Sequence, residues 1–305
     1  MTSLAERLII LWSTPLYILL IVGEIILSHY HDRNLYSFKD SVTNFVFMLL
    51  NSGIDLLWRS TYFLVMMIAY EYKLFEITNP WIYFFTLLIA EDFLFYWLHR
   101  IEHTVRILWA VHVTHHSSEK FNLTTGFRSS VFQPLYRFIF FLPLAILGFK
   151  PLDIMLVFSA TQIWGILVHT KAINKMGFLE HILVTPSHHR VHHASNILYL
   201  DKNMGMFLIL WDKLFGTFQQ ELPESVYEPI KYGITKDTSK LQYHHKVLHE
   251  FEDLSIDLRN HPSLSDKINY LIQPPGWSAD GSTKTTRQLH KEIAEQGNIL
   301  VSSQL

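Results

Sequence analysis

The chain has 305 residues, of which 49% are hydrophobic, 14% aromatic and only 17% charged, and its formal net charge is −2. Soluble domains carry roughly a quarter charged residues, so the shortfall predicts contact with lipid. The near-neutral balance excludes the strongly basic surface typical of nucleic-acid-binding proteins. Cysteine is absent, which excludes disulfides, iron–sulfur clusters and thiolate haem ligation, so a metal would need nitrogen and oxygen ligands.

Two long apolar stretches open the chain. Residues 8–27 are long enough to cross the roughly 30 Å hydrocarbon core, with a signal peptide as the alternative. Residues 42–70 contain Asp55 and Arg59, which lie four positions apart and therefore on one helix face. In a membrane this pair should face the bundle interior; a helix lying at the interface is the alternative.

Further apolar stretches follow. Residues 81–98 are expected to span after the Asn79-Pro80 break, in a helix that ends at His99. Residues 135–149 and 152–173 predict a helical hairpin, and because the first is short for a full span, a re-entrant pair is the alternative. We therefore expect an all-α integral membrane bundle of about four spans with a cytosolic helical cap that carries a histidine-rich dimetal site. The expected divisions are N-terminal transmembrane helices (1–98), a core that includes the hairpin (99–277, hairpin about 135–173) and a polar tail (278–305), poorly ordered at its end.

Three short histidine runs carry the chemistry: His99-Arg-Ile-Glu-His103, His112-Val-Thr-His115-His116 and His189-Arg-Val-His192-His193. On a helix, positions three and four apart share a face, and neutral imidazole is the commonest protein ligand for metals. Eight histidines exceed the four ligands of one tetrahedral site, so they predict two metals in a shared pocket. The alternative, histidines on solvated helix faces, fits poorly with three such runs between apolar segments.

The pattern HxxxH, HxxHH and HHxxHH, with the flanking text from Asp92 to Arg100 and from Trp211 to Thr217, resembles the membrane fatty acid hydroxylase and sterol desaturase superfamily. Within it, the similarity is greatest to alkylglycerol monooxygenases and their bacterial relatives, over about residues 37–277. The resemblance implies two irons that activate O₂ and abstract hydrogen from a lipid or sterol-like substrate, with hydroxylation and desaturation both open. Zinc could replace iron in a purified sample. The implied ligands are His99, His103, His112, His115, His116, His189, His192 and His193.

Several other residues are candidates near the metals. His169 closes an apolar run, and the resemblance implies a further ligand on that helix, with a hydrogen-bonding role as the alternative. His188 points away from His189 on a helix, and the resemblance implies His189, His192 and His193 as the ligands while leaving the role of His188 open, so we list it among the residues that could support the ligands. Ligating histidines usually donate their second N–H to a carboxylate or a carbonyl. The candidates for this role are Asp92, Glu102, Asp201, Asn203 and Asp212. Asp92 needs a partner because it lies inside a membrane helix. For Glu102, a charge on the protein surface is the alternative.

One position departs from the relatives. In alkylglycerol monooxygenases a glutamate linked to tetrahydrobiopterin use directly follows HxxxH, and here that position is Thr104. Glu102 is the candidate cofactor-binding replacement, although it is rotated by about 100° on a helix. The departure argues against pterin dependence and ether-lipid cleavage. The chain has no GxGxxG fingerprint, so electrons must come from a separate donor protein or a reduced pterin.

Basic residues are abundant on the side that bears the three histidine runs, which we call the histidine boxes. The positive-inside rule therefore places this side in the cytoplasm. The expected partners are the membrane, a lipid substrate and an electron donor. The alternative of another class is a non-catalytic or transport-related metal-binding membrane protein. Transport predicts ionisable residues at midplane depth in several spans, whereas here the histidines gather at one end of the spans.

Overall fold

The computed structural model describes residues 4–31, 33–236 and 243–295. All regular elements in this part of the chain are helical, and β pairing is confined there to two isolated bridges, Leu183–Leu208 and Ala194–Tyr232. The expectation of an all-α chain is therefore confirmed. The far end of the expected polar tail, residues 296–305, lies outside the described residues.

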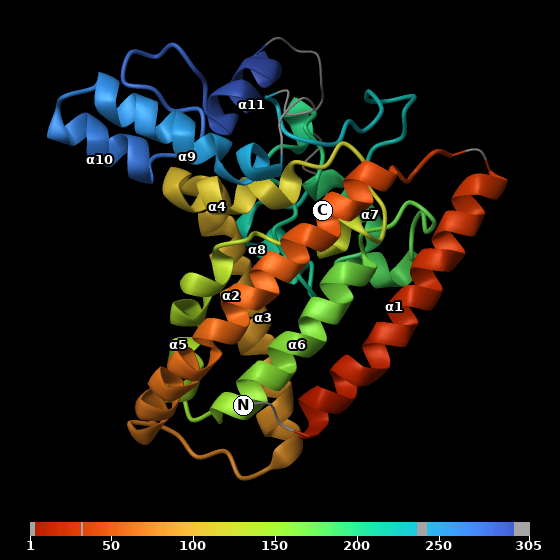
Figure 1. The fold of residues 1–305 in the computed structure, drawn as a ribbon, viewed down its shortest axis with the longest axis vertical. Coiled ribbons are helices and arrows are strands. Elements are labelled where there is room, and N and C mark those ends of the chain that lie inside the picture. Colours follow the sequence, from red (N-terminus) through yellow and green to blue (C-terminus); the bar gives the residue numbers. More distant parts are fainter. Residues whose placement is uncertain (1–3, 32, 237–242, 296–305) are drawn as a thin grey trace.

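Long apolar helices form the lower half of the molecule, where they run side by side (Figure 1). They are α1 (Leu4–Tyr30), α2 (Phe38–Glu71), α3 (Pro80–Thr104), α5 (Arg137–Ile146) and α6 (Pro151–Leu167). The inward faces of α2, α3, α5 and α6 build the main apolar core around Leu87, Leu98 and Leu144, which are fully buried. Their outward faces remain apolar: Leu57 of α2 is 80% exposed and Trp81 of α3 is 84% exposed. A surface of this kind is stable against lipid rather than water.

Two helices, Arg7–Tyr30 and Pro80–Thr104, are long and apolar enough to cross a bilayer. With 10 and 17 residues, α5 and α6 are shorter than the roughly 20 residues that a spanning helix needs. They nevertheless form the expected hairpin and pack against α2 and α3. Two spans are therefore supported by length and composition.

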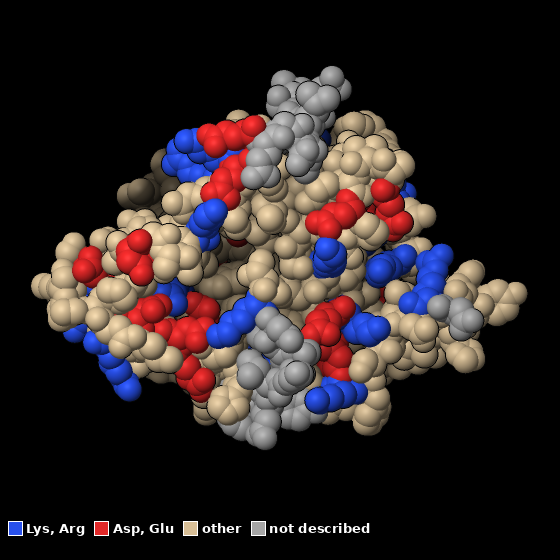
Figure 2. Space-filling view, turned by 90° about the horizontal axis from the view of Figure 1, so that it is seen from above, with Lys and Arg blue, Asp and Glu red and all other residues tan. Residues whose placement is uncertain are grey.

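Most of the remaining helices form a cap over the upper end of the bundle (Figure 1), whereas α8 (Leu210–Phe215) packs against the middle of α3 through Trp211 and Phe93. Their bounds are α4 (Arg106–His116), α7 (Pro186–His192), α8 (Leu210–Phe215), α9 (Tyr243–Asn260), α10 (Leu264–Ile272) and α11 (Thr286–Glu295), with 3₁₀ turns η1 (Thr125–Phe127), η2 (Gln133–Leu135), η3 (Gly177–His181) and η4 (Ile197–Tyr199). Charged side chains of both signs are spread over the top of the cap (Figure 2). Part of the expected tail belongs to this cap, because α11 packs on η4 and His290 Nε2 lies 2.7 Å from the carbonyl oxygen of Ile197.

The third helix is longer than expected. It was expected to end at His99, but α3 continues to Thr104 and ends where Val105 adopts an extended backbone, with φ −119° and ψ 113°. No glycine or proline interrupts residues 99–104, so the helix has no local reason to stop earlier. His99 and His103 consequently lie on the last turns of one rigid helix.

The first helix is anchored to loops beside the histidine boxes. Glu24 of α1 is buried, and its Oε2 accepts hydrogen bonds from the backbone N–H of Leu123, at 2.8 Å, and from the hydroxyl of Tyr36. Its Oε1 accepts a hydrogen bond from the Thr170 hydroxyl. One buried carboxylate thus holds α1 to the segments that follow α4 and α6.

Candidate metal centre

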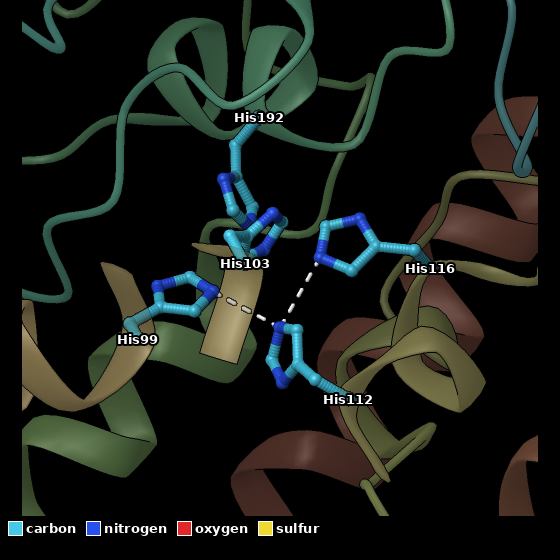
Figure 3. Close-up of side chains that lie close together, drawn as sticks. All are labelled: His99, His103, His112, His116 and His192. Atoms are coloured by element: carbon cyan, nitrogen blue, oxygen red, sulfur yellow. Dashed lines mark hydrogen bonds between the residues drawn. The ribbon is translucent and has the colours of Figure 1, made fainter. Parts of the chain in front are cut away.

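Nine histidines meet in two adjoining groups at the junction of bundle and cap. In each group the ring nitrogens that could bind a metal lie within 4.8 Å of one another. Figure 3 shows the rings of the larger group directed toward one another from different elements. The larger group contains His99, His103, His112, His116 and His192, and the smaller one contains His115, His169, His189 and His193.

Helix geometry explains how one box supplies both groups. On α4, His112 and His116 are four residues apart and face the larger group, whereas His115 is rotated by about 100° from His116 and faces the smaller one. The third box also supplies both groups, but with the two groups exchanged. Its i, i+4 pair, His189 and His193, faces the smaller group, while His192 faces the larger group.

Most of the rings are fixed through Nδ1, so that Nε2 points inward. The Nε2 atoms of His99 and His112 are 3.1 Å apart, and those of His169 and His189 are 2.9 Å apart. Metal-ligating histidines characteristically donate the outer N–H to a carbonyl or a carboxylate. Such Nδ1 contacts are His99 to Met204 O (2.8 Å), His103 to Asp201 Oδ1 (3.1 Å), His112 to Glu102 Oε2 (3.1 Å), His115 to Arg128 O (2.8 Å), His169 to Gly165 O (2.7 Å) and His192 to Lys202 O (3.0 Å).

The donor set fits metal ions. Nε2 of His103 and Nε2 of His192 are buried and have no hydrogen-bond partner among the described residues. Burial disfavours the imidazolium form, so the pKa of His112 falls to about 3 and the pKa values of His116 and His193 lie well below the usual 6.5. The rings are therefore neutral near pH 7, which leaves their inward lone pairs free to bind a cation.

Glu102 is an interior residue, so the surface-charge alternative is wrong. Its carboxylate is completely buried and accepts hydrogen bonds from the Tyr136 hydroxyl at 2.6 Å and from the Gln133 amide at 2.9 Å. With its Oε2 beside Nδ1 of His112, it orients that ring. The hydroxyl of Thr104 donates to the carbonyl of Arg100 at 2.9 Å and so bonds back to its own helix.

Asp92 contacts a loop rather than a histidine, which corrects the expected contact. One oxygen accepts the backbone N–H of Phe207 at 2.9 Å. The other accepts the backbone N–H of Leu208 at 3.0 Å and the indole N–H of Trp211 at 2.9 Å. A carboxylate inside an apolar helix needs such donors. Asp92 therefore holds this loop against α3. The loop contains Met204, whose backbone carbonyl binds His99.

Asp212 and Asn203 shape the same loop. Asp212 accepts backbone N–H groups of Met204 at 2.6 Å and Gly205 at 2.8 Å, so it positions the carbonyl that binds His99. Asn203 adopts a left-handed backbone, with φ 55°, and its amide donates to the carbonyls of His188 and Gln219. Both support the site through the backbone, since neither side chain reaches the histidine rings.

His188 lies outside both histidine groups. Its Nδ1 accepts the backbone N–H of Thr185 at 3.3 Å, and its Nε2 lies 3.4 Å from Oε2 of Glu180. It therefore caps the start of α7, the helix that presents His189 and His192. His188 therefore has a structural role, although it is adjacent to the ligand candidate His189.

Sequence reasoning missed the buried residues that hold the boxes from a distance. Arg128 is completely buried, and its guanidinium donates to the carbonyl of Thr114 and to the side chains of Ser117 and Asn44. Its own carbonyl binds His115. The only signal in the sequence was an arginine followed by an apolar segment, which does not reveal its partners.

Two cavities reach the histidines from opposite sides. One, among the bundle helices, is lined by His99, His115 and His169 together with polar side chains that include Gln162. The other, on the cap side, is lined by His103, His116 and His192, with Trp109 and the C-terminal segment around residues 284–289. The site is thus accessible both to a molecule from the apolar bundle and to one from the polar cap.

Comparison with known proteins matches part of this chain to one protein-family model and most of it to several relatives. Residues 84–217 match the model of the fatty acid hydroxylase family. Alkylglycerol monooxygenase of Homo sapiens is 36% identical over 288 residues, which are 93% of this chain and 62% of the relative. An ornithine lipid hydroxylase of Rhizobium tropici is 33% identical over 133 residues (43% of this chain, 40% of the relative), and a Delta(7)-sterol 5(6)-desaturase of Gibberella zeae is 28% identical over 151 residues (48% and 44%).

The chain spans between 49% and 62% of the length of the alkylglycerol monooxygenases it matches. No solved structure matches it significantly. The matched residues 84–217 contain all three histidine boxes, His169 and the loop around Met204, so the family match and the histidine cluster coincide. Residues 84–217 therefore match a fatty acid hydroxylase domain, and the curated relatives are consistent with the superfamily of hydroxylases and sterol desaturases that the histidine boxes predict.

Proposed function

We propose that this chain is a membrane-bound di-iron monooxygenase that hydroxylates a lipid. One atom of O₂ enters a C–H bond of the lipid, and the other leaves as water with two electrons and two protons from an external donor. The observation that carries the proposal is the cluster of nine histidines in two adjoining groups, whose neutral rings are directed inward. The family match over the same residues supports it.

Two ions are proposed because the ligands divide into five and four. The larger group would hold one iron and the smaller group the other, with the nine histidines as ligands. When bound, the irons supply activation of O₂ for attack on an unactivated C–H bond. Uncharged imidazole ligands leave the positive charge of the ions uncompensated, which favours a strong oxidant.

The protein's own residues orient the site and exclude water. Glu102, with Tyr136 and Gln133, fixes the ring of His112, and the loop held by Asp92 and Asp212 fixes His99. The cavity among the bundle helices would admit a lipid tail to the histidines. The surrounding apolar core restricts bulk water and would therefore shield the reacting C–H bond from it.

The proposed membrane placement has about four spans and a cytosolic cap. From Pro80 to His99, α3 rises by roughly 29 Å, close to the thickness of the hydrocarbon core. The histidines would then lie at one membrane face, with the charged cap beyond it in water (Figure 2). Basic residues on this side favour the cytoplasm.

For the electron donor we propose a separate protein of reductase–ferredoxin or cytochrome type. Thr104 points back to its own helix, which argues against tetrahydrobiopterin, although Glu102 is near enough to the rings to replace the missing glutamate. The named activity of the relatives makes an ether lipid the first substrate to test. Desaturation by the same site is the second outcome to look for.

The test uses the purified protein in detergent. We expect about two iron ions per chain. We also expect O₂ uptake that depends on added lipid and on a reductant. The reductant is a reductase–ferredoxin pair in one series of assays and tetrahydrobiopterin in another. His112→Ala should abolish uptake, while His261→Ala, at the end of α9 and outside both groups, should not. Bound metal without O₂ uptake on any lipid would instead favour the non-catalytic or transport-related alternative.

A further inference from the structure

The short helix α8 lies lower in the molecule than α4 and α7, beside α3 (Figure 1). Ring contacts join Trp211 of α8 to Phe93 of α3, with centroids 5.1 Å apart, and Phe215 to Tyr96, with centroids 5.4 Å apart. Asp92 secures the contact, because it accepts the indole N–H of Trp211 at 2.9 Å. These contacts place α8 against the part of α3 that precedes the first histidine box.

The depth of α8 in a membrane follows from the rise of α3. Phe93 lies roughly 9 Å and Trp97 roughly 3 Å below His99, at 1.5 Å per residue. In the proposed membrane placement the hydrocarbon core begins at about His99 on the cap side. Trp211 and Phe215, which contact Phe93 and Trp97, therefore lie at the depth of acyl chains. With six residues α8 is too short to cross, so it enters one leaflet only.

A second segment is joined to α8 through the backbone. The N–H of Ile209 donates to the carbonyl of Ile182 at 3.1 Å, and Nζ of Lys213 donates to the carbonyl of His181 at 3.1 Å. The turn η3 and the residue after it are thus held beside α8. We call these two segments, residues 177–182 and 209–215, the wedge.

The outer surface of the wedge is apolar. Leu210 and Leu214 are four residues apart, so they share one face of α8, and Leu214 is 64% exposed. Phe178 is 73% exposed, and Leu179 and Ile182 are exposed beside it. Exposed apolar surface of this extent marks a site of interaction with another molecule or with a membrane. At the depth of acyl chains, lipid is the partner that this surface fits.

The charged side chains of the wedge have partners inside the protein. Asp212 is completely buried, Oε2 of Glu180 lies 3.4 Å from Nε2 of His188, and Lys213 binds the carbonyl of His181. The wedge can therefore enter lipid without leaving one of these charges unpaired, which would be costly there.

An apolar groove continues the wedge surface onto the outer face of α3. Trp211 closes its upper end, and its one polar side chain, Thr86, donates its hydroxyl to the carbonyl of Ile82 on its own helix at 2.7 Å. The groove is lined by Phe85, Thr86, Ile89, Ala90, Phe93 and Trp211. Its width and polarity suit a single acyl chain that lies along α3.

We propose that the wedge is inserted into the leaflet nearest the cap, with the acyl chains of that leaflet as its partner and one chain lying in the groove below Trp211. The inference rests on the proposed membrane placement and is independent of the metals and of the oxidised substrate. It follows that lipid supports the metal centre from outside, because the loop that ends in the wedge carries Met204, whose carbonyl binds His99.

Spin labels measure the depth of the wedge in the intact protein. Because the chain has no cysteine, Phe178→Cys and Leu214→Cys each provide one label site after reconstitution into phosphatidylcholine vesicles. References are Leu57→Cys, on the outward face of α2, and Val226→Cys, 65% exposed in the cap. Power saturation compares collisions with O₂, which concentrates in lipid, and with a water-soluble nickel chelate.

We expect both wedge labels to be more accessible to O₂ than to the nickel chelate, as at Leu57, with the opposite order at Val226. Wedge labels as accessible to nickel as the label at Val226 would overturn the insertion. Wedge labels shielded from both reagents would indicate a protein partner and refute lipid as the partner. A label at Leu57 that is accessible to nickel would overturn the membrane placement itself, and the inference with it.

A charge in the wedge provides a second test. Leu214→Glu places a carboxylate among acyl chains, so we expect the melting temperature in lipid nanodiscs to fall by about 3 °C or more. The matched variant Val226→Glu, on the water-exposed cap, should melt within about 1 °C of the wild type. Equal melting temperatures for Leu214→Glu and the wild type would contradict insertion of α8.

Discussion

At the residue scale, two adjacent histidines have different roles for geometric reasons. His188 and His189 are separated by about 100° on α7, and only His189 belongs to a histidine group. His188 accepts the N–H of Thr185 at the helix start, a task that glutamine performs in many capping boxes. The HHxxHH pattern therefore contains three candidate ligands and one cap.

This difference predicts opposite outcomes for matched substitutions. His188→Gln should keep full metal content, because the glutamine oxygen can accept the Thr185 N–H in place of the ring. His189→Gln should lose about one metal ion per chain, because it removes one ligand of the smaller group. Metal analysis of both purified variants decides the point. Equal loss in the two variants would show that His188 contributes to binding.

Glu102 allows a second prediction at this scale. Glu102→Gln keeps the size of the side chain but removes the charge that faces Nδ1 of His112. Outer partners of metal ligands typically change affinity or activity by about 10–100-fold, and we expect a loss of turnover in that range. Thr104→Ala, which removes only a bond to Arg100 O, is the control and should stay within about threefold. Turnover of Glu102→Gln at the wild-type level would contradict the orienting role.

At the scale of elements, sequence patterns predicted what is local. Apolar length predicted α1, α2 and α3, and histidine spacing predicted which rings share a face. The loop of residues 203–217 was beyond such reasoning, because it is held to α3 by backbone N–H groups that Asp92 binds 115 positions earlier in the sequence. Arg128 is similar, since its partners come from α2 and α4. Contacts of this kind depend on tertiary structure and leave no periodic trace.

The arrangement of α2 and α3 predicts on which side of the membrane each of two loops lies. If α3 spans the membrane, Glu76, which is 76% exposed in the loop before it, lies on the side opposite the cap. Lys231, 67% exposed, belongs to the cap. Because the chain has no cysteine, Glu76→Cys and Lys231→Cys each provide a single label site. In intact cells an impermeant maleimide should label Glu76→Cys only; labelling of Lys231→Cys alone would reverse the orientation.

At the scale of the whole molecule, folding buries more histidine rings than carboxyl groups. Burial lowers the pKa of a histidine and raises the pKa of a carboxyl group, so the two kinds of group change stability with pH in opposite directions. Outside the bundle helices, burial lowers the pKa values of seven clustered histidines: His112, His115, His116, His169, His189, His192 and His193. Burial also raises the pKa of Asp212 to about 6 and raises the pKa of Asp201 above its usual value. A lowered histidine pKa means that the unfolded chain binds protons first as the pH falls, whereas a raised carboxyl pKa has the opposite sign.

These histidines outnumber the two carboxyl groups seven to two, so they determine the net sign. The stability of the metal-free protein should be highest above pH 6.5 and should fall as the pH decreases from there toward the lowered pKa values. Each titrating histidine contributes at most about 1.4 kcal/mol per pH unit, so a loss of several kcal/mol is expected between pH 6.5 and 5. Tryptophan fluorescence during heating in detergent measures it. Bound metal competes with protons for Nε2, so the loaded protein should begin to lose stability at a lower pH. A melting temperature that stays constant or rises from pH 6.5 to 5 in the metal-free protein would show that the imidazoles are not buried as a neutral cluster.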